Sequence, residues 1–218
     1  MRTDLPSQQI DSTVIIQKID AAVAARADSV LGFTATEHYA VYRGGDETHP
    51  AAEMTVKDTY TKGAGKSFTI LSQSGSEFLF RLGLKPLLES DRQINLPGNI
   101  EKSWFVSGNY AMKLRPGGAV QLNGRSCYLL DIRARRKAAN TINGSIWVDA
   151  QDGTLVQVDG MATASASMFT GNAHLMRQYE NVSGFSMATH ARADSDSSMV
   201  GHSVIKIDYS DYQLQLKQ

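Results

Sequence analysis

The sequence is poor in cysteine, in long apolar runs and in any excess of charge. Its single cysteine, Cys127, cannot form an intramolecular disulfide, so cysteine usage does not indicate the redox compartment. No apolar run approaches the ~18 residues that a membrane-spanning helix requires. The 22 basic and 22 acidic residues cancel to a net charge of zero. This balance argues against a nucleic-acid-binding protein, because such proteins neutralise phosphates with an excess of Lys and Arg.

Signatures of the common catalytic sites are also missing. No G-x-S-x-G elbow occurs, no G-x-G-x-x-G follows a strand, and "KGAGKS" is too short for a P-loop. The strand-like surroundings of Cys127 predict a buried structural thiol rather than a reactive one. The sequence therefore predicts no enzyme, no catalytic residue and no cofactor.

The histidines do not have the spacing of a metal site. They are His38, His49, His174, His190 and His202, and no two of them are separated by one or three residues. Because a zinc site needs three or four convergent ligands, the sequence predicts no metal. We expect His38 and His174 on strand surfaces and His49 and His202 in loops.

Residues 11–30, "DSTVIIQKIDAAVAARADSV", predict an N-terminal helix. Asp11 or Ser12 can cap its free N–H groups. Its apolar residues follow helical spacing and predict one buried stripe that packs on a sheet: Ile15, Ile19, Ala22, Val23 and Val30.

After this helix the apolar pattern alternates with a period of two, which is typical of strands. Short turns rich in Gly, Asp and Pro separate the first strands and predict an antiparallel meander. The first three strands are expected at 33–42, 53–61 and 67–73, and further β-like stretches at 103–114, 118–135, 140–160, 171–193 and 203–216. Since no repeat or linker divides the chain, we expect a single domain over 1–218, with 1–12 as a flexible N-terminal segment.

The segment 76–90, "SEFLFRLGLKPLLES", interrupts the strands and is unusually apolar. Gly83 weakens a helix, and Pro86 removes a hydrogen-bond donor and crowds the preceding turn. We expect two short helical pieces with a bend between them. One interpretation is a pair of core helices, and the other is a movable lid over an apolar cavity.

The stretch 143–160, "NGSIWVDAQDGTLVQVDG", holds three aspartates, Asp149, Asp152 and Asp159. A calcium loop places its oxygen ligands at alternating positions and ends on a bidentate acid, and this stretch lacks that pattern. Alternation and the Asp152–Gly153 pair instead predict a β-hairpin. Its apolar face would carry Ile146, Val148, Val156 and Val158.

The basic cluster "RARRK" at 133–137 has two interpretations. It is typical of a solvated strand end whose charges discourage edge pairing. Clustered Lys and Arg also favour contact with anionic membrane headgroups.

Several of these stretches, in this order, resemble the LolA/LolB-like superfamily of outer-membrane lipoprotein-sorting proteins, in an uncharacterised branch. The resemblance covers the chain from about residue 13 onward and rests on "VKDTYTKGAGKSFTILSQSGSEFL", "GNYAMKL", "LNGRSCYLLDIRARRK", "NGSIWVDAQDGTLVQVDG" and "HLMRQYENVSGFSMATH…SVIKIDYSDYQL". It implies a mainly β (α+β) fold. That fold is an incomplete antiparallel β-barrel of about 9–11 strands, with an N-terminal helix and a mid-chain helical lid. The family's lid-holding arginine on an early strand has no secure counterpart here, since Arg43 stands in a different context.

The resemblance further implies a periplasmic, non-enzymatic carrier of an apolar ligand, a lipid or lipoprotein acyl chain. The export signal would lie outside this sequence, and a membrane anchor or a membrane-protein donor and acceptor stay open. The alternatives are an envelope-stress sensor of the same fold and, third, a lipid-ester hydrolase. The residues expected to line the cavity and lid are Phe33, Tyr39, Val56, Ile70, Leu79, Leu82, Leu87, Ile146, Val148 and Val156.

Overall fold

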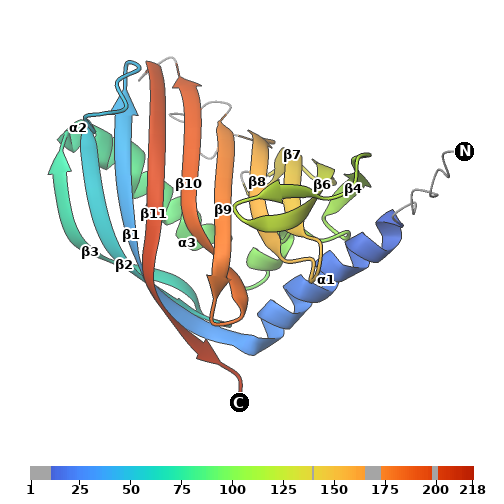
Figure 1. The fold of residues 1–218 in the computed structure, drawn as a ribbon. Coiled ribbons are helices and arrows are strands. Elements are labelled where there is room, and N and C mark those ends of the chain that lie inside the picture. The colour runs from blue at the N-terminus through green and yellow to red at the C-terminus, as the bar shows by residue number, and fades with distance from the viewer. Residues whose placement is uncertain (1–10, 139, 165–172, 198–200) are drawn as a thin grey trace, which may run out of the picture.

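A computed structural model describes residues 11–138, 140–164, 173–197 and 201–218. The chain begins with a helix and continues as a long series of strands, interrupted once by helices in the middle (Figure 1). The helical elements are α1 (Ser12–Ser29), α2 (Glu77–Leu79), the π-helical η1 (Phe80–Leu84), α3 (Lys85–Ile94) and the 3₁₀ turn η2 (Ile100–Ser103). The strands are β1 (Val30–Arg43), β2 (Ala52–Thr61), β3 (Gly65–Gly75), β4 (Tyr110–Leu114), β5 (Val120–Leu122), β6 (Arg125–Ala134), β7 (Ile142–Asp149), β8 (Leu155–Ala162), β9 (His174–Val182), β10 (Phe185–Ser197) and β11 (Gly201–Leu216).

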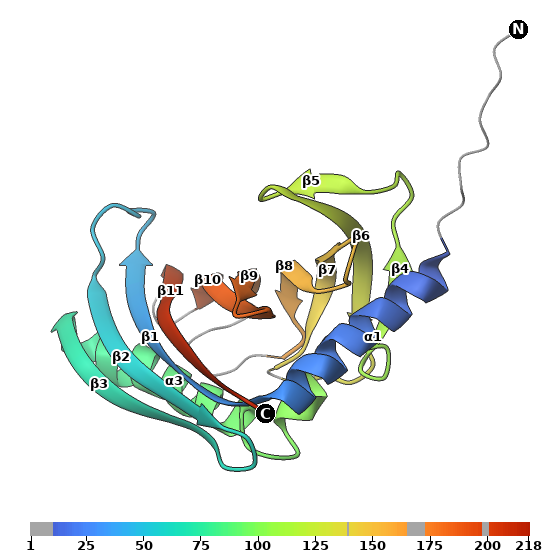
Figure 2. The ribbon, with the colours of Figure 1, turned by 60° about the horizontal axis from the view of Figure 1, so that its bottom comes forward.

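All eleven strands join one antiparallel sheet in the order β3-β2-β1-β11-β10-β9-β8-β7-β6-β4, and β5 pairs with β6 beside this path. The two ends of the order, β3 and β4, do not pair with each other within the described residues, so the sheet curves without closing (Figure 2). This confirms the expected incomplete barrel. The strand β11 pairs with β1 along almost its whole length, which brings the last strand of the chain beside the first.

The helix α1 begins where the sequence predicted. Asp11 is the N-cap, and its carboxylate accepts a 2.8 Å hydrogen bond from the Thr13 N–H. The predicted apolar stripe is narrower than expected, because of the helix residues only Ile15 and Ile19 are fully buried. The expected flexible segment 1–12 lies outside the described residues except for its last two, which cap and begin this helix.

The mid-chain helix is not broken as the sequence predicted. Ser76 caps α2, and the helix continues through Gly83 and Pro86 to Ile94. The irregularity is absorbed in η1, where the Lys85 N–H bonds to the Phe80 carbonyl, five residues back. Pro86 lies just after η1, in the first turn of α3, where a proline is tolerated.

Two apolar clusters hold the helices against the sheet, at opposite ends of it (Figures 1 and 2). The α1 cluster joins Ile15 and Ile19 to strands β4, β6, β7 and β8. The α3 cluster joins Leu79, Phe80, Leu84 and Leu88 to strands β1 and β2. Each helix therefore covers its own half of the sheet.

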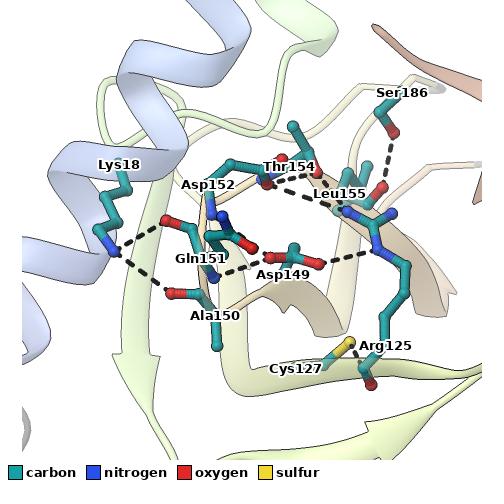
Figure 3. A network of polar contacts seen from close by, with 10 residues as sticks. All are labelled: Lys18, Arg125, Cys127, Asp149, Ala150, Gln151, Asp152, Thr154, Leu155 and Ser186. Carbon is teal, nitrogen blue, oxygen red and sulfur yellow. Dashed lines mark hydrogen bonds and ion pairs between the residues drawn. The ribbon is translucent and has the colours of Figure 1, made fainter. Parts of the chain in front are cut away.

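The predicted hairpin 143–160 is confirmed as β7, a turn and β8. Asp149 accepts hydrogen bonds from the backbone of Gln151 and Asp152 and pairs with Arg125, with Nε 2.9 Å from Oδ2 (Figure 3). The Asp152 carboxylate accepts from the N–H and hydroxyl of Thr154. Both carboxylates therefore stabilise the turn, because they accept hydrogen bonds from its own backbone and hydroxyl groups.

The same turn anchors α1. The Lys18 ammonium donates to the carbonyls of Ala150 and Gln151, at 3.3 and 3.0 Å (Figure 3). Gly153 adopts a φ of 75°, and a Cβ there would lie 2.7 Å from the Lys18 backbone carbon. Only glycine allows this close approach of turn and helix.

Two details of the strands differ from the sequence prediction, the hairpin register and the position of His202, and one detail, the burial of Cys127, confirms it. A register shift between Trp147 and Val148 places Leu155, not Val156, opposite Val148, so the hairpin alternation is offset by one residue. His202 lies in β11 rather than in a loop. Cys127 is buried as predicted, on β6 opposite Val120 of β5, and burial raises the pKa of its thiol.

Candidate ligand-binding face

The face of the sheet that both helices cover, here called the inner face, can be followed residue by residue across the strands. Directly paired residues on neighbouring strands point to the same side. One row of such pairs crosses eight strands from β6 to β2: Leu130, Ile146, Val158, Arg177, Ala191, Ile207, Tyr39 and Met54. Its first three members belong to the α1 cluster, and its last three belong to or pack on the α3 cluster. Both helices therefore lie on one face.

The ten predicted lining residues do not form one patch. Tyr39, Val56 and Leu79 are buried in the α3 cluster, with Leu87 packed against it. Ile146 and Val148 are buried in the α1 cluster, and Val156 is fully buried at the register shift. Most of the predicted lining is thus packed against helices, and its role in binding stays a prediction.

The remaining three predicted residues are more accessible. Phe33 is half-buried and stacks on Tyr60 with ring centroids 5.3 Å apart. Leu82 is half-buried in η1, and Ile70 on the edge strand β3 is 43% exposed. Ile70 pairs with Val56, so it extends the inner face toward solvent.

A buried ionic cluster, which the sequence did not predict, lies under α3. The Lys66 ammonium is 2.8 Å from Glu37, 3.0 Å from Asp58 and 2.6 Å from Asp91. Its partners come from β1, β2 and α3, so one lysine joins two strands and the helix to β3. The Tyr39 hydroxyl donates to the other oxygen of Glu37.

The charges of this cluster do not balance, because one ammonium faces three carboxylates. Although burial lowers the pKa of Lys66, the carboxylates, led by Asp91, raise it well above its ordinary value. Burial, reinforced by Glu37 and only partly offset by Lys66, raises the pKa of Asp58 to about 7. Neither Asp58 oxygen accepts a well-formed hydrogen bond from the described residues. Asp58 therefore keeps its proton more readily than an ordinary aspartate does.

Between the two apolar clusters, the inner face is polar and aromatic. Arg177 of β9 lies between Val158 and Ala191, and its guanidinium hydrogen-bonds Tyr179 two residues further on. Tyr209 first, then Tyr179 and Asp91, raise the pKa of Arg177, so side chains of β9, β11 and α3 lie within electrostatic range of it. Water still reaches Arg177, which is exposed.

A signal for these residues was present in the sequence. Glu37 follows Phe33 and Ala35 in phase, Asp58 follows Val56, and Arg177 follows Leu175. A charged residue at a position where alternation requires an apolar one is a candidate for a buried or functional role. Lys66 stands at the end of a turn and carried no comparable signal.

A hollow of about 550 Å³ opens elsewhere, over β4, β6 and β7. Asp131 and Arg133, which line it, alternate with the buried Leu130 and Ile132 and so lie on the outer face. Its lining also includes Lys113 and Asn143. Polar or charged side chains thus make up half of the lining, and the other half is Ala111, Met112, Ile132 and Gly144.

Across the residues that the structure describes, no group of three or more His, Cys, Asp or Glu side chains is placed to hold a metal ion. The cation among the carboxylates of the inner face is the Lys66 ammonium. No helix of the described chain is long and apolar enough to cross a membrane.

Neither a protein-family model nor a curated protein matches the sequence. Among solved structures, the LolA superfamily protein NE2245 from Nitrosomonas europaea superposes with a TM-score of 0.50, at 13% identity and over 94% of each chain. The fold is LolA-like. A putative outer membrane lipoprotein-sorting protein domain from Vibrio parahaemolyticus gives a TM-score of 0.49 at 13% identity, over 92% of this chain and 93% of the other. A DUF1329 family protein from Desulfovibrio piger gives 0.45 at 14% identity, with the same coverage.

Proposed function

We propose that this protein is a periplasmic, non-enzymatic carrier that holds a lipid or lipoprotein acyl chain on its inner face. The proposal rests on the arrangement of apolar clusters and helices on that face. Two apolar clusters are each closed by a separate helix, and the sheet itself stays open at β3 and β4. The LolA-like fold supports the same function, because NE2245 is a LolA superfamily protein.

The mid-chain helix is the element best suited to open. In the α3 cluster, side chains from α2, η1 and α3 pack on Tyr39, Met54 and Val56 of the sheet. If the helix moves away, an acyl chain can pack on the same sheet residues in its place. Burying a chain of about 16 carbons at ~0.8 kcal/mol per methylene supplies on the order of 13 kcal/mol before the cost of moving the helix. The π turn η1 divides this helix and offers a place for it to bend.

The direct test is the content of the purified protein. We expect organic extraction after gentle purification to release lipid or acylated peptide, identified by mass spectrometry. A neutral fluorescent acyl ester should then bind the emptied protein. A clean extract together with no binding of this probe would contradict the carrier function and leave the sensor as the better hypothesis. Release of hydrolysed probe would favour the hydrolase.

A variant tests whether the mid-chain helix takes part. We expect Leu82→Asp to weaken binding of the neutral ester far more than it lowers the melting temperature, because Leu82 is only half-buried. Val120→Asp is the matched control, since Val120 lies on β5 outside the sheet path and is 43% exposed. Equal losses of binding and stability in Leu82→Asp would place Leu82 in the structural core and contradict its role in the lid.

A further inference from the structure

The inner face carries one charged residue where its pattern is otherwise apolar. In the row of eight paired residues from Leu130 to Met54, Arg177 is the single charged member. It stands at the middle, with Val158 of the α1 cluster on one side and Ala191 on the other. A ligand lying over either cluster would reach Arg177 with one end.

Arg177 forms no ion pair with any described residue, and it is exposed, so a ligand can reach it. Asp91, the carboxylate that acts on its pKa, is held 2.6 Å from Lys66 and also accepts from Asn95. The hydrogen-bond partner of Arg177 is the Tyr179 hydroxyl and not a carboxylate. The positive charge is therefore uncompensated at contact distance.

Two further polar groups, on α1 and β10, have no hydrogen-bond partner among the described residues. The Nε of Arg26, on α1, is buried without a hydrogen-bond partner in the described chain. Its charge acts on Tyr60 and Tyr212, whose rings both meet Phe33 on the inner face. Thr189 is the extra residue of the β10 bulge beside Tyr179, and its hydroxyl is likewise buried and unpartnered there.

We propose that Arg177 binds the anionic head, a carboxylate or a phosphate, of the amphiphile whose chain lies on the inner face. The proposal rests on the carrier function proposed above and narrows its ligand to an acyl compound with a negative end. A guanidinium donates two parallel N–H groups to such an oxyanion and is the side chain best shaped for it. The chain would extend from Arg177 over the α3 cluster, and Tyr209 and Tyr179 would flank the head.

The test compares two probes that differ only in charge, a fluorescent polyene fatty acid and its methyl ester. For the wild-type protein we expect the acid to bind at least about tenfold more tightly than the ester, as a charge-assisted pair to arginine requires. Arg177→Gln should bring this ratio close to one, because it should weaken binding of the acid far more than binding of the ester. Arg177→Lys should restore part of the preference.

The matched control is Arg133→Gln, because Arg133 is exposed on the outer face of β6. It should keep the wild-type ratio. An unchanged ratio in Arg177→Gln would overturn the proposal, and an equal loss of both probes would reduce Arg177 to a structural role. Failure of the wild-type protein to bind either probe would overturn the carrier function itself.

Inorganic phosphate, titrated alone by calorimetry, separates a head-group site from a free-anion site. We expect no binding, because the apolar chain supplies most of the affinity. Phosphate that binds as tightly as the fatty acid would show that Arg177 serves a free anion and would contradict the amphiphile. A lysophosphatidate that displaces the acid probe would extend the site from carboxylate to phosphate heads.

Discussion

Replacing Asp58 with asparagine should stabilise the protein at neutral and alkaline pH, although the substitution removes an ion pair. The carboxyl is fully buried, and its pKa is about 7 in the folded protein against 3.8 as the ordinary value. Between these pH values the folded state holds a proton that the unfolded state has lost. The free energy of unfolding therefore falls as pH rises through this window.

The size of the effect follows from the width of the window. Each pH unit of difference corresponds to about 1.4 kcal/mol, so a window of about three units costs on the order of 4 kcal/mol above pH 7. Asparagine keeps the shape of the side chain and carries no charge at any pH. Lys66 retains Glu37 and Asp91, so the lysine is still paired in the variant.

The assay is urea unfolding of the wild-type protein and Asp58→Asn at several pH values from 5 to 8. Groups outside the ionic cluster contribute alike to both proteins, so the difference between the two unfolding free energies reports Asp58 and the partners whose pKa depends on it. We expect this difference to grow in favour of the variant as pH rises. Asp211→Asn is the control, because Asp211 is exposed and its φ of 53° suits asparagine. A difference that stays constant, or that turns against Asp58→Asn as pH rises, would refute the reasoning.

Three further predictions concern other parts of the molecule. Lys66→Met should lower the free energy of unfolding by about 3–5 kcal/mol, because the carboxylates around Lys66 are left buried without a cation. Urea unfolding measures this loss, and an unchanged stability would contradict it. Gly153→Ala should lower the free energy of unfolding by about 1–3 kcal/mol, and with it the melting temperature, because the new Cβ meets the Lys18 backbone. A calorimetric melting temperature equal to that of the wild-type protein would show that α1 can shift. Cys127 should react with a thiol reagent much more slowly in the native protein than after unfolding, because it is fully buried and the pKa of its thiol is raised. Equal reaction rates in the two states would place Cys127 at the surface.

The uneven predictability of the candidate face has a physical cause. Alternation correctly indicated that Ile146 and Val148 share a buried face, because the period of a strand is local. The same alternation holds a signal at Arg177, in phase with Leu175, but the sequence analysis did not single it out, and alternation does not tell what lies near it. The register shift in the β7–β8 hairpin was missed, since a bulge adds a residue without a strong local signal.

The sequence by itself determined the local elements of this protein. The Asp11 cap, the Asp152–Gly153 turn and the strand periods each depend on residues close together in the chain. Only the tertiary structure decided which strands meet and what each helix covers. The pairing of β11 with β1, the gathering of three carboxylates around Lys66 and the unpaired charge of Arg177 all join distant segments. Such contacts depend on how the whole sheet curves, because a strand's period tells which residues share a face and not which strand lies beside it.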